Sequence, residues 1–132
     1  MKYLVLTCRI LLGVAMAFFG ANHILNFLHM TPPPSDATTW ATLMAVHHYF
    51  SVVGVLELVA GILLLVGRFV PLALTILGPI LVNILLFNIL FEAGGLAPGL
   101  ACTLFWLVLL VVYRRNFMPL FAADPKPDTT TP

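Results

Sequence analysis

Four long apolar stretches restrict how this chain can fold more than any other feature. A helix needs about 20 mostly apolar residues to cross a bilayer core of roughly 30 Å. Of the 132 residues, 61% are hydrophobic and 8% are charged, which is far from the balance of a soluble domain. The stretches are Tyr3–Leu28, Tyr49–Gly67, Val70–Phe91 and Leu96–Tyr113. We therefore expect an all-α integral membrane protein, a single four-helix bundle over residues 1–123, with a disordered Pro- and Thr-rich tail over 124–132.

The positions of the cations predict the orientation of the bundle. If the helices alternate in direction, every Lys and Arg falls on one side, and the other side receives acidic residues and histidines. The cations are Lys2, Arg9, Arg68, Arg114, Arg115 and Lys126. By the positive-inside rule both termini lie in the cytoplasm. The net charge of +1 is thus a topology signal, and we expect no nucleic-acid partner.

One connection is long enough to carry structure of its own. Its three prolines, at positions 32–34, cannot be helical, and Ser35 or Asp36 can cap a short helix that follows. That helix would hold Trp40, Leu43, Met44 and His47 on one side. We expect an external amphipathic helix between the first two membrane helices, lying across the outer mouth of the bundle or in the lipid interface.

Three polar residues fall inside the predicted membrane spans: Arg9, Glu57 and Asn83. At 1.5 Å per residue Arg9 lies about 9 Å and Glu57 about 15 Å from the cytoplasmic side, a difference that an Arg side chain can span. Arg9 shares a helix stripe with Gly13 and Gly20, and Glu57 shares one with Gly54 and Gly61. Small residues allow close helix packing in lipid. We therefore expect Arg9 to pair with Glu57 across this contact, with Asn83 close by.

This intramembrane cluster has two interpretations. A buried ion pair would fix the register of the helices. Alternatively, ionisable groups in a membrane span mark a proton-handling or ligand-binding site. The residues alone leave both open.

A second polar cluster is predicted near the outer face. It comprises Asn22, His23, Asn26, His47, Asn88 and Glu92. No histidine pair has the spacing of a known metal site, so we predict no metal. The cluster is either interfacial polarity or a site in which His23, with Asn22 or Asn26, holds a quinone headgroup. We predict no intrinsic cofactor, with quinone or lipid as the possible ligands.

The two cysteines exclude one kind of chemistry. Cys8 and Cys102 should lie about 20 Å apart along the bundle, too far for a disulfide. There is no Cys-x-x-Cys motif, no nucleophile motif and no phosphate loop. We therefore expect the chain to catalyse no reaction alone.

Several segments together resemble the DoxX family of small bacterial four-helix membrane proteins. These are Arg9-Ile-Leu-Leu-Gly13, Gly20-Ala-Asn-His23, the three prolines, the run from Val55 through Glu57 and Gly61, Arg68-Phe-Val-Pro71, and Pro79-Ile-Leu-Val-Asn83-Ile-Leu-Leu-Phe. Arg9, Glu57 and Asn83 match polar positions of that pattern. Asn88 departs from it, because related sequences usually place a His there.

The resemblance implies a location and a role. The family is bacterial, which places the chain in the inner membrane, and it takes its name from similarity to DoxD, the membrane subunit of an archaeal thiosulfate:quinone oxidoreductase. It thus implies a non-autonomous subunit of a membrane redox assembly, linked to quinone or to sulfur and thiol compounds. The alternative is a non-catalytic accessory subunit packed against a larger respiratory or photosynthetic complex. Either role implies partners among lipids and other membrane subunits. A transporter of protons or small molecules is less favoured, because no internal repeat is present.

Overall fold

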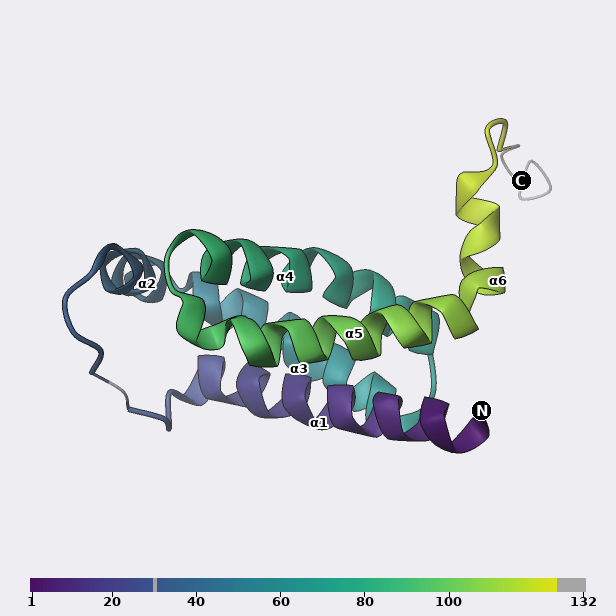
Figure 1. Cartoon of the computed structure of the whole chain (residues 1–132), viewed down its shortest axis with the longest axis horizontal. Helices are drawn as coiled ribbons and strands as arrows, with labels where there is room; N and C mark the ends of the chain where they lie inside the picture. Colours follow the sequence, from purple (N-terminus) through teal and green to yellow (C-terminus); the bar gives the residue numbers. More distant parts are fainter. Residues whose placement is uncertain (30, 126–132) are drawn as a thin grey trace, which may run out of the picture.

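The computed structural model describes residues 1–29 and 31–125, and within them the chain is helical, with no strand. Four long helices run side by side and a shorter one, α2, lies across one end of them (Figure 1). Met1 and α6 lie at the opposite end. We call these the α2 end and the terminal end. The elements are α1 (Lys2–Leu25), α2 (Asp36–Val46), α3 (Tyr49–Val66), α4 (Val70–Leu90), η1 (Ala93–Gly95), α5 (Leu96–Val112), α6 (Arg114–Phe117) and η2 (Met118–Phe121).

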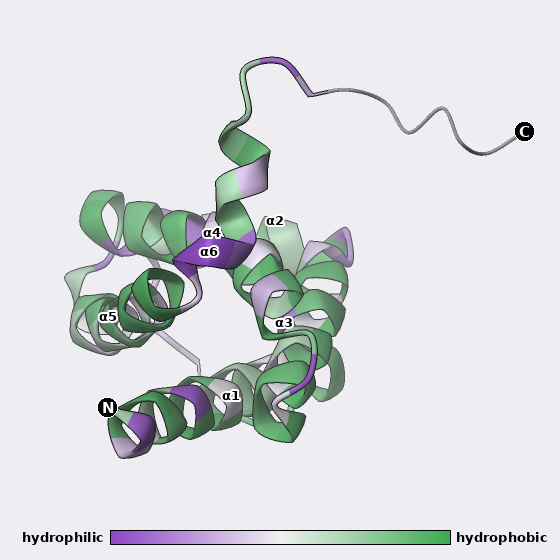
Figure 2. Cartoon of the chain, turned by 90° about the vertical axis from the view of Figure 1, so that its right-hand side faces the viewer, coloured by the Kyte–Doolittle hydropathy of each residue, from purple (hydrophilic) through white to green (hydrophobic). Residues whose placement is uncertain are grey.

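The four predicted long helices are present, and each is long and apolar enough to cross a membrane. Large apolar side chains stay exposed along them, for example Val52 at 63% and Leu104 at 59%. Figure 2 shows that the long helices are hydrophobic over most of their length, with hydrophilic residues near Met1 and in α6. A surface of this kind suits lipid rather than water. Of the predicted disordered tail, residues 126–132 lie outside the described part of the chain.

The first long helix is shorter than expected. It ends at Leu25, whereas the sequence predicted Leu28, because Asn26 adopts a left-handed conformation with φ of 49°. Its backbone N–H donates to the carbonyl oxygen of Asn22. Asn tolerates this conformation better than most residues, so it can end a helix as Gly does.

Ser35 caps α2 as predicted, and α2 lies across one end of the bundle (Figure 1), but its inward face differs from the prediction. Ser35 accepts a hydrogen bond from the N–H of Thr38 at 3.2 Å. Ala37 is buried and Trp40 half-buried, but Leu43 is 53% exposed and His47 is also exposed. The inward face is therefore narrower than the predicted stripe.

Glycines bring α1 and α3 into backbone contact. A Cβ on Gly20 would lie 2.7 Å from the carbonyl oxygen of Gly54, and one on Gly61 would lie 2.8 Å from that of Gly13. The predicted glycine stripes thus do face each other. Because the two helices are antiparallel, this contact sets which residues of α1 lie opposite which residues of α3.

A candidate ligand-binding cavity

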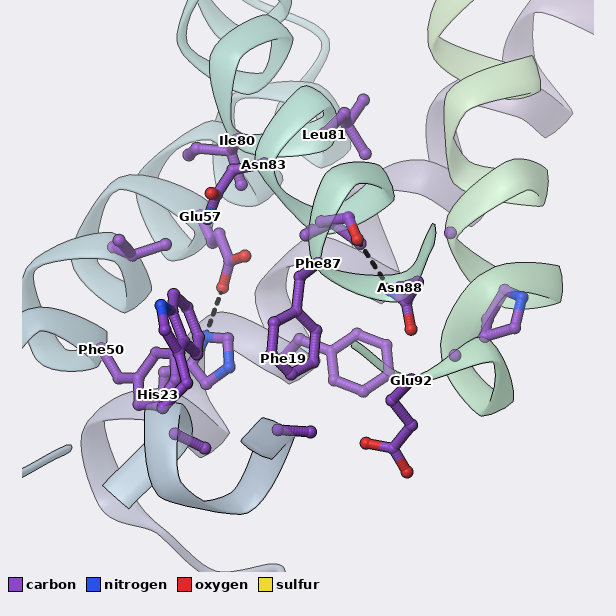
Figure 3. A pocket seen from close by; sticks show the side chains of 18 of the residues that line it. Phe19, His23, Phe50, Glu57, Ile80, Leu81, Asn83, Phe87, Asn88 and Glu92 are labelled. Atoms are coloured by element: carbon purple, nitrogen blue, oxygen red, sulfur yellow. Dashed lines mark hydrogen bonds and ion pairs between the residues drawn. The ribbon is translucent and has the colours of Figure 1, made fainter. Parts of the chain in front are cut away.

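The α2 half of the bundle encloses a cavity of about 460 Å³. All four long helices and α2 contribute to its walls. The lining is mostly apolar and includes five aromatic residues and six polar ones. The aromatic residues are Phe19, Trp40, Tyr49, Phe50 and Phe87, and the polar residues are His23, Thr38, Glu57, Asn83, Asn88 and Glu92. Figure 3 shows most of these side chains around the cavity.

The buried carboxyl group of Glu57 is hydrogen-bonded to His23, whose side chain is half-buried. Oε2 of Glu57 lies 2.8 Å from Nδ1 of His23, and Glu57 is only 1% exposed (Figure 3). The glycine contact creates this pair, because a Cβ on Gly54 would lie 2.7 Å from that of His23. A carboxylate at this depth needs a partner, and the partner is a histidine from the predicted outer cluster.

The predicted pairing of Arg9 with Glu57 is wrong. The guanidinium of Arg9 lies against Gly67, where a Cβ would be 2.8 Å from Cζ, and Arg9 makes no ion pair with any described residue. Gly67 is ten residues beyond Glu57 along α3, which is about 15 Å. The depth estimates assumed a common starting plane for the helices, whereas the glycine contact sets α1 opposite a different part of α3.

Arg9 instead lies at the C-terminal end of α3. A cation is favourable there because the last carbonyl groups of a helix carry partial negative charge. Gly67 has φ of 75°, a conformation that suits glycine, and its missing side chain leaves room for the guanidinium. Arg9 is therefore remote from the cavity.

Asn83 and Asn88 differ in their surroundings. Asn83 lines the cavity with Glu57 but is exposed and has no hydrogen-bond partner in the described part of the chain, so it caps no charge pair. Asn88 is 8% exposed and donates from Nδ2 to the carbonyl oxygen of Ile84 at 2.8 Å. Its side chain lies against Gly95, where a larger residue would clash. Asn88 thus joins α4 to the start of α5.

The structure divides the predicted outer cluster. His23, Asn88 and Glu92 line the cavity, whereas Asn22, Asn26 and His47 do not. Asn22 accepts from the N–H of Leu28 at 2.9 Å and so stabilises the turn after α1. The predicted support of a headgroup by Asn22 or Asn26 therefore does not fit their positions.

Sequence reasoning missed the aromatic residues that hold the histidine and cover the cavity. The ring of Phe50 stacks on His23, with centroids 5.3 Å apart and an interplanar angle of 14°. Trp40 of α2 packs on Phe50 and on Phe87, at 5.8 Å and 4.8 Å between centroids. Phe50 precedes Glu57 by two helical turns, a spacing that places both on one face and could have indicated the contact. Cys102, also in the lining, had no such signal.

Fold and cavity together define a small four-helix protein of the membrane-spanning type, with a buried His–Glu pair in an aromatic cavity. The chain is 30% identical over 127 residues to the uncharacterized protein YwoB of Bacillus subtilis (strain 168), a match that covers 90% of this chain and 82% of YwoB. The chain therefore belongs to the same family as YwoB. No family model and no solved structure matches it.

Proposed function

We propose that this chain is a DoxX-like integral membrane protein that binds a quinone-type molecule in its cavity and serves as a non-autonomous subunit of a membrane redox assembly. One observation carries the proposal: a buried His23–Glu57 pair projects into a cavity with aromatic walls. Pockets of roughly 300–1,000 Å³ that are mostly apolar, with a few convergent polar groups, are typical ligand sites. The cavity volume falls within that range.

The chemistry of the lining favours a flat, lipid-soluble ring. Aromatic side chains such as Trp40 and Phe87 can stack on a ring, and His23 and Glu57 can hydrogen-bond its polar edge. The lining has two carboxylates and no Lys or Arg. The two carboxylates would repel a thiosulfate or sulfite anion, and no cation of the lining would offset that repulsion. In the proposed assembly, sulfur-anion chemistry therefore belongs to another subunit.

The proposed setting is a bacterial inner membrane with the terminal end in the cytoplasm. The cations support this orientation, since Lys2, Arg68, Arg114 and Arg115 are all exposed and lie at or beyond the terminal ends of the helices. In a chain whose Cys8 and Cys102 are replaced by Ser, the thiol introduced by Asp124→Cys should not react with an impermeant thiol reagent applied outside the cell. The thiol introduced by Pro33→Cys should react, and the reverse pattern would contradict the orientation.

Isolation from the native membrane in mild detergent tests the function. We expect the chain to purify with partner subunits and with extractable quinone. The double variant His23→Leu/Glu57→Leu, which replaces the pair by apolar side chains, should lose the quinone. The control His47→Leu removes an exposed histidine outside the cavity and should retain it.

Three results would contradict the proposal. Equal quinone in the wild type and the double variant would show that the quinone is carried elsewhere. A large respiratory or photosynthetic complex without quinone bound to this chain would favour the accessory role. Oxidation of thiosulfate with quinone by the purified chain alone would show that it is not a non-autonomous subunit.

A further inference from the structure

One oxygen of the buried carboxylate has no partner. Glu57 uses Oε2 to bind His23, and Oε1 accepts no hydrogen bond from any residue that the structure describes. Figure 3 shows this second oxygen directed away from His23. Because Glu57 lines the cavity and is 1% exposed, the cavity is where a partner for Oε1 can lie. Oε1 is therefore open to the cavity, where an occupant that carries a hydrogen-bond donor can bind to it.

With one proton shared by the pair, Oε1 is an acceptor whether that proton lies on Nδ1 or on Oε2. The 2.8 Å separation of Oε2 and Nδ1 requires one proton between them. If that proton is on Nδ1, Glu57 is a carboxylate. If it is on Oε2, Oε1 is the carbonyl oxygen of the acid. In both arrangements Oε1 needs a donor from the ligand.

This requirement distinguishes the two redox forms of a quinone. A quinone ring carries only carbonyl oxygens, which are acceptors and would face Oε1 with no proton between them. A hydroquinone carries O–H groups, one of which can donate to Oε1 while the ring lies among Phe50, Trp40 and Phe87. Neither form is charged, so the lack of Lys and Arg in the lining is no obstacle.

We infer that the cavity binds the reduced hydroquinone in preference to the quinone, with Glu57 Oε1 accepting a hydrogen bond from a ring hydroxyl. This inference rests on the proposed function and specifies which form of the ligand the site holds. Glu57 is thereby the specificity-determining residue, and His23 is the positioning residue that keeps Oε2 occupied.

The two tryptophans of the chain provide a direct test. Trp40 lines the cavity, whereas Trp106 is bound to α4 through a 2.8 Å hydrogen bond from Nε1 to the carbonyl oxygen of Leu74, outside the lining. Under anaerobic conditions, the purified chain in detergent is titrated with decylubiquinol and with decylubiquinone while fluorescence is recorded. We expect decylubiquinol to quench with a Kd at least about tenfold lower. Trp40→Phe should remove the saturable signal.

The variant Glu57→Gln tests the role of the carboxylate. Its amide group can bind His23 through oxygen and turn an N–H₂ donor toward the cavity, which should lower or reverse the preference for decylubiquinol. Asp36→Asn is the matched control, because Asp36 is exposed and outside the lining, and it should keep the wild-type ratio. Circular dichroism establishes that each variant is folded, and the wild-type ratio remains a test if Glu57→Gln is not.

The outcomes separate the inference from the proposed function. Equal Kd values for the two forms in the wild type would overturn the inference and leave the proposed function standing. Saturable quenching by neither form would overturn both. Tetraphenylphosphonium is included as a third probe. If it alone binds, the aromatic and acidic lining serves a lipophilic cation, and both proposals are wrong.

Discussion

The two halves of the bundle are built differently. In the terminal half, leucines fill the space between the helices, and Leu12, Leu64, Leu74, Leu77 and Leu109 are fully buried. In the α2 half, the same four helices surround a cavity lined by aromatic and polar residues. The terminal half also holds the hydrogen bond from Trp106 to Leu74, which joins α5 to α4.

This difference shows how a short chain can combine a stable bundle with a ligand site. The packed half stabilises the bundle without polar contacts among its core leucines. The other half can then leave space unfilled and keep a buried carboxylate. A cavity and a buried carboxyl group are both costly in a bundle that serves only as a scaffold. Their presence together in one half is the main reason to assign binding to it.

Truncating large buried side chains should reveal the difference in packing between the two halves most strongly. Leu77→Ala in the packed half should lower the free energy of unfolding by about 2 kcal/mol or more, because it opens a new void. Met16→Ala should cost less, because Met16 already borders the cavity. Reversible unfolding in mixed micelles measures both. Equal losses would mean that the two halves are packed alike.

Adding a side chain at the glycine contact between α1 and α3 should have the next largest effect on stability. A Cβ on Gly20 would lie 2.6 Å from the backbone nitrogen of Leu58, so Gly20→Ala must push α1 away from α3. We expect a loss of about 1–3 kcal/mol in the same unfolding assay. The control Gly94→Ala places its Cβ no closer than 3.8 Å to a neighbour and should be near neutral. A neutral Gly20→Ala would contradict the backbone contact.

A double-mutant cycle should locate the partner of Glu57, with a smaller effect. We expect His23→Leu and Glu57→Leu to be coupled by about 1 kcal/mol, because the two side chains share a hydrogen bond and His23→Leu leaves the buried Glu57 unpaired. Arg9→Met and Glu57→Leu should add within about 0.5 kcal/mol, since the two residues are remote. If Arg9 and Glu57 were coupled and His23 and Glu57 were additive, Arg9 would be the partner of Glu57.

The sequence predicts the helices of this fold well and their relative register poorly. Apolar length alone places α3, α4 and α5 to within a residue at each end, because few polar residues interrupt them. The glycine stripes also indicate correctly which faces of α1 and α3 meet. How far one helix slides along the other is set by the backbone contacts at Gly20 and Gly54. No depth estimate contains that information.

The residues of the candidate site are likewise only partly predictable from the sequence. Glu57 is recognisable in the sequence because a carboxylate inside an apolar span is rare and costly. Its partner is not, since the partner depends on how far α1 is displaced along α3, and His23 lies 14 residues beyond Arg9 on α1. The aromatic cover is harder still to predict, because Trp40 meets Phe87 only once α2 has folded across the end of the bundle.

Reaction of the two cysteines with N-ethylmaleimide tests the account most directly. Cys102 lines the cavity, and Cys8 is 4% exposed in the packed half. Maleimide labels a thiol only where the reagent can reach it. We predict that the detergent-purified chain is labelled at Cys102 and not at Cys8, and that saturating decylubiquinol slows the labelling several-fold. The variant Cys102→Ser should remain unlabelled. Labelling of Cys8 as fast as Cys102, or labelling of Cys102 that decylubiquinol does not slow, would contradict a ligand-binding cavity in the α2 half.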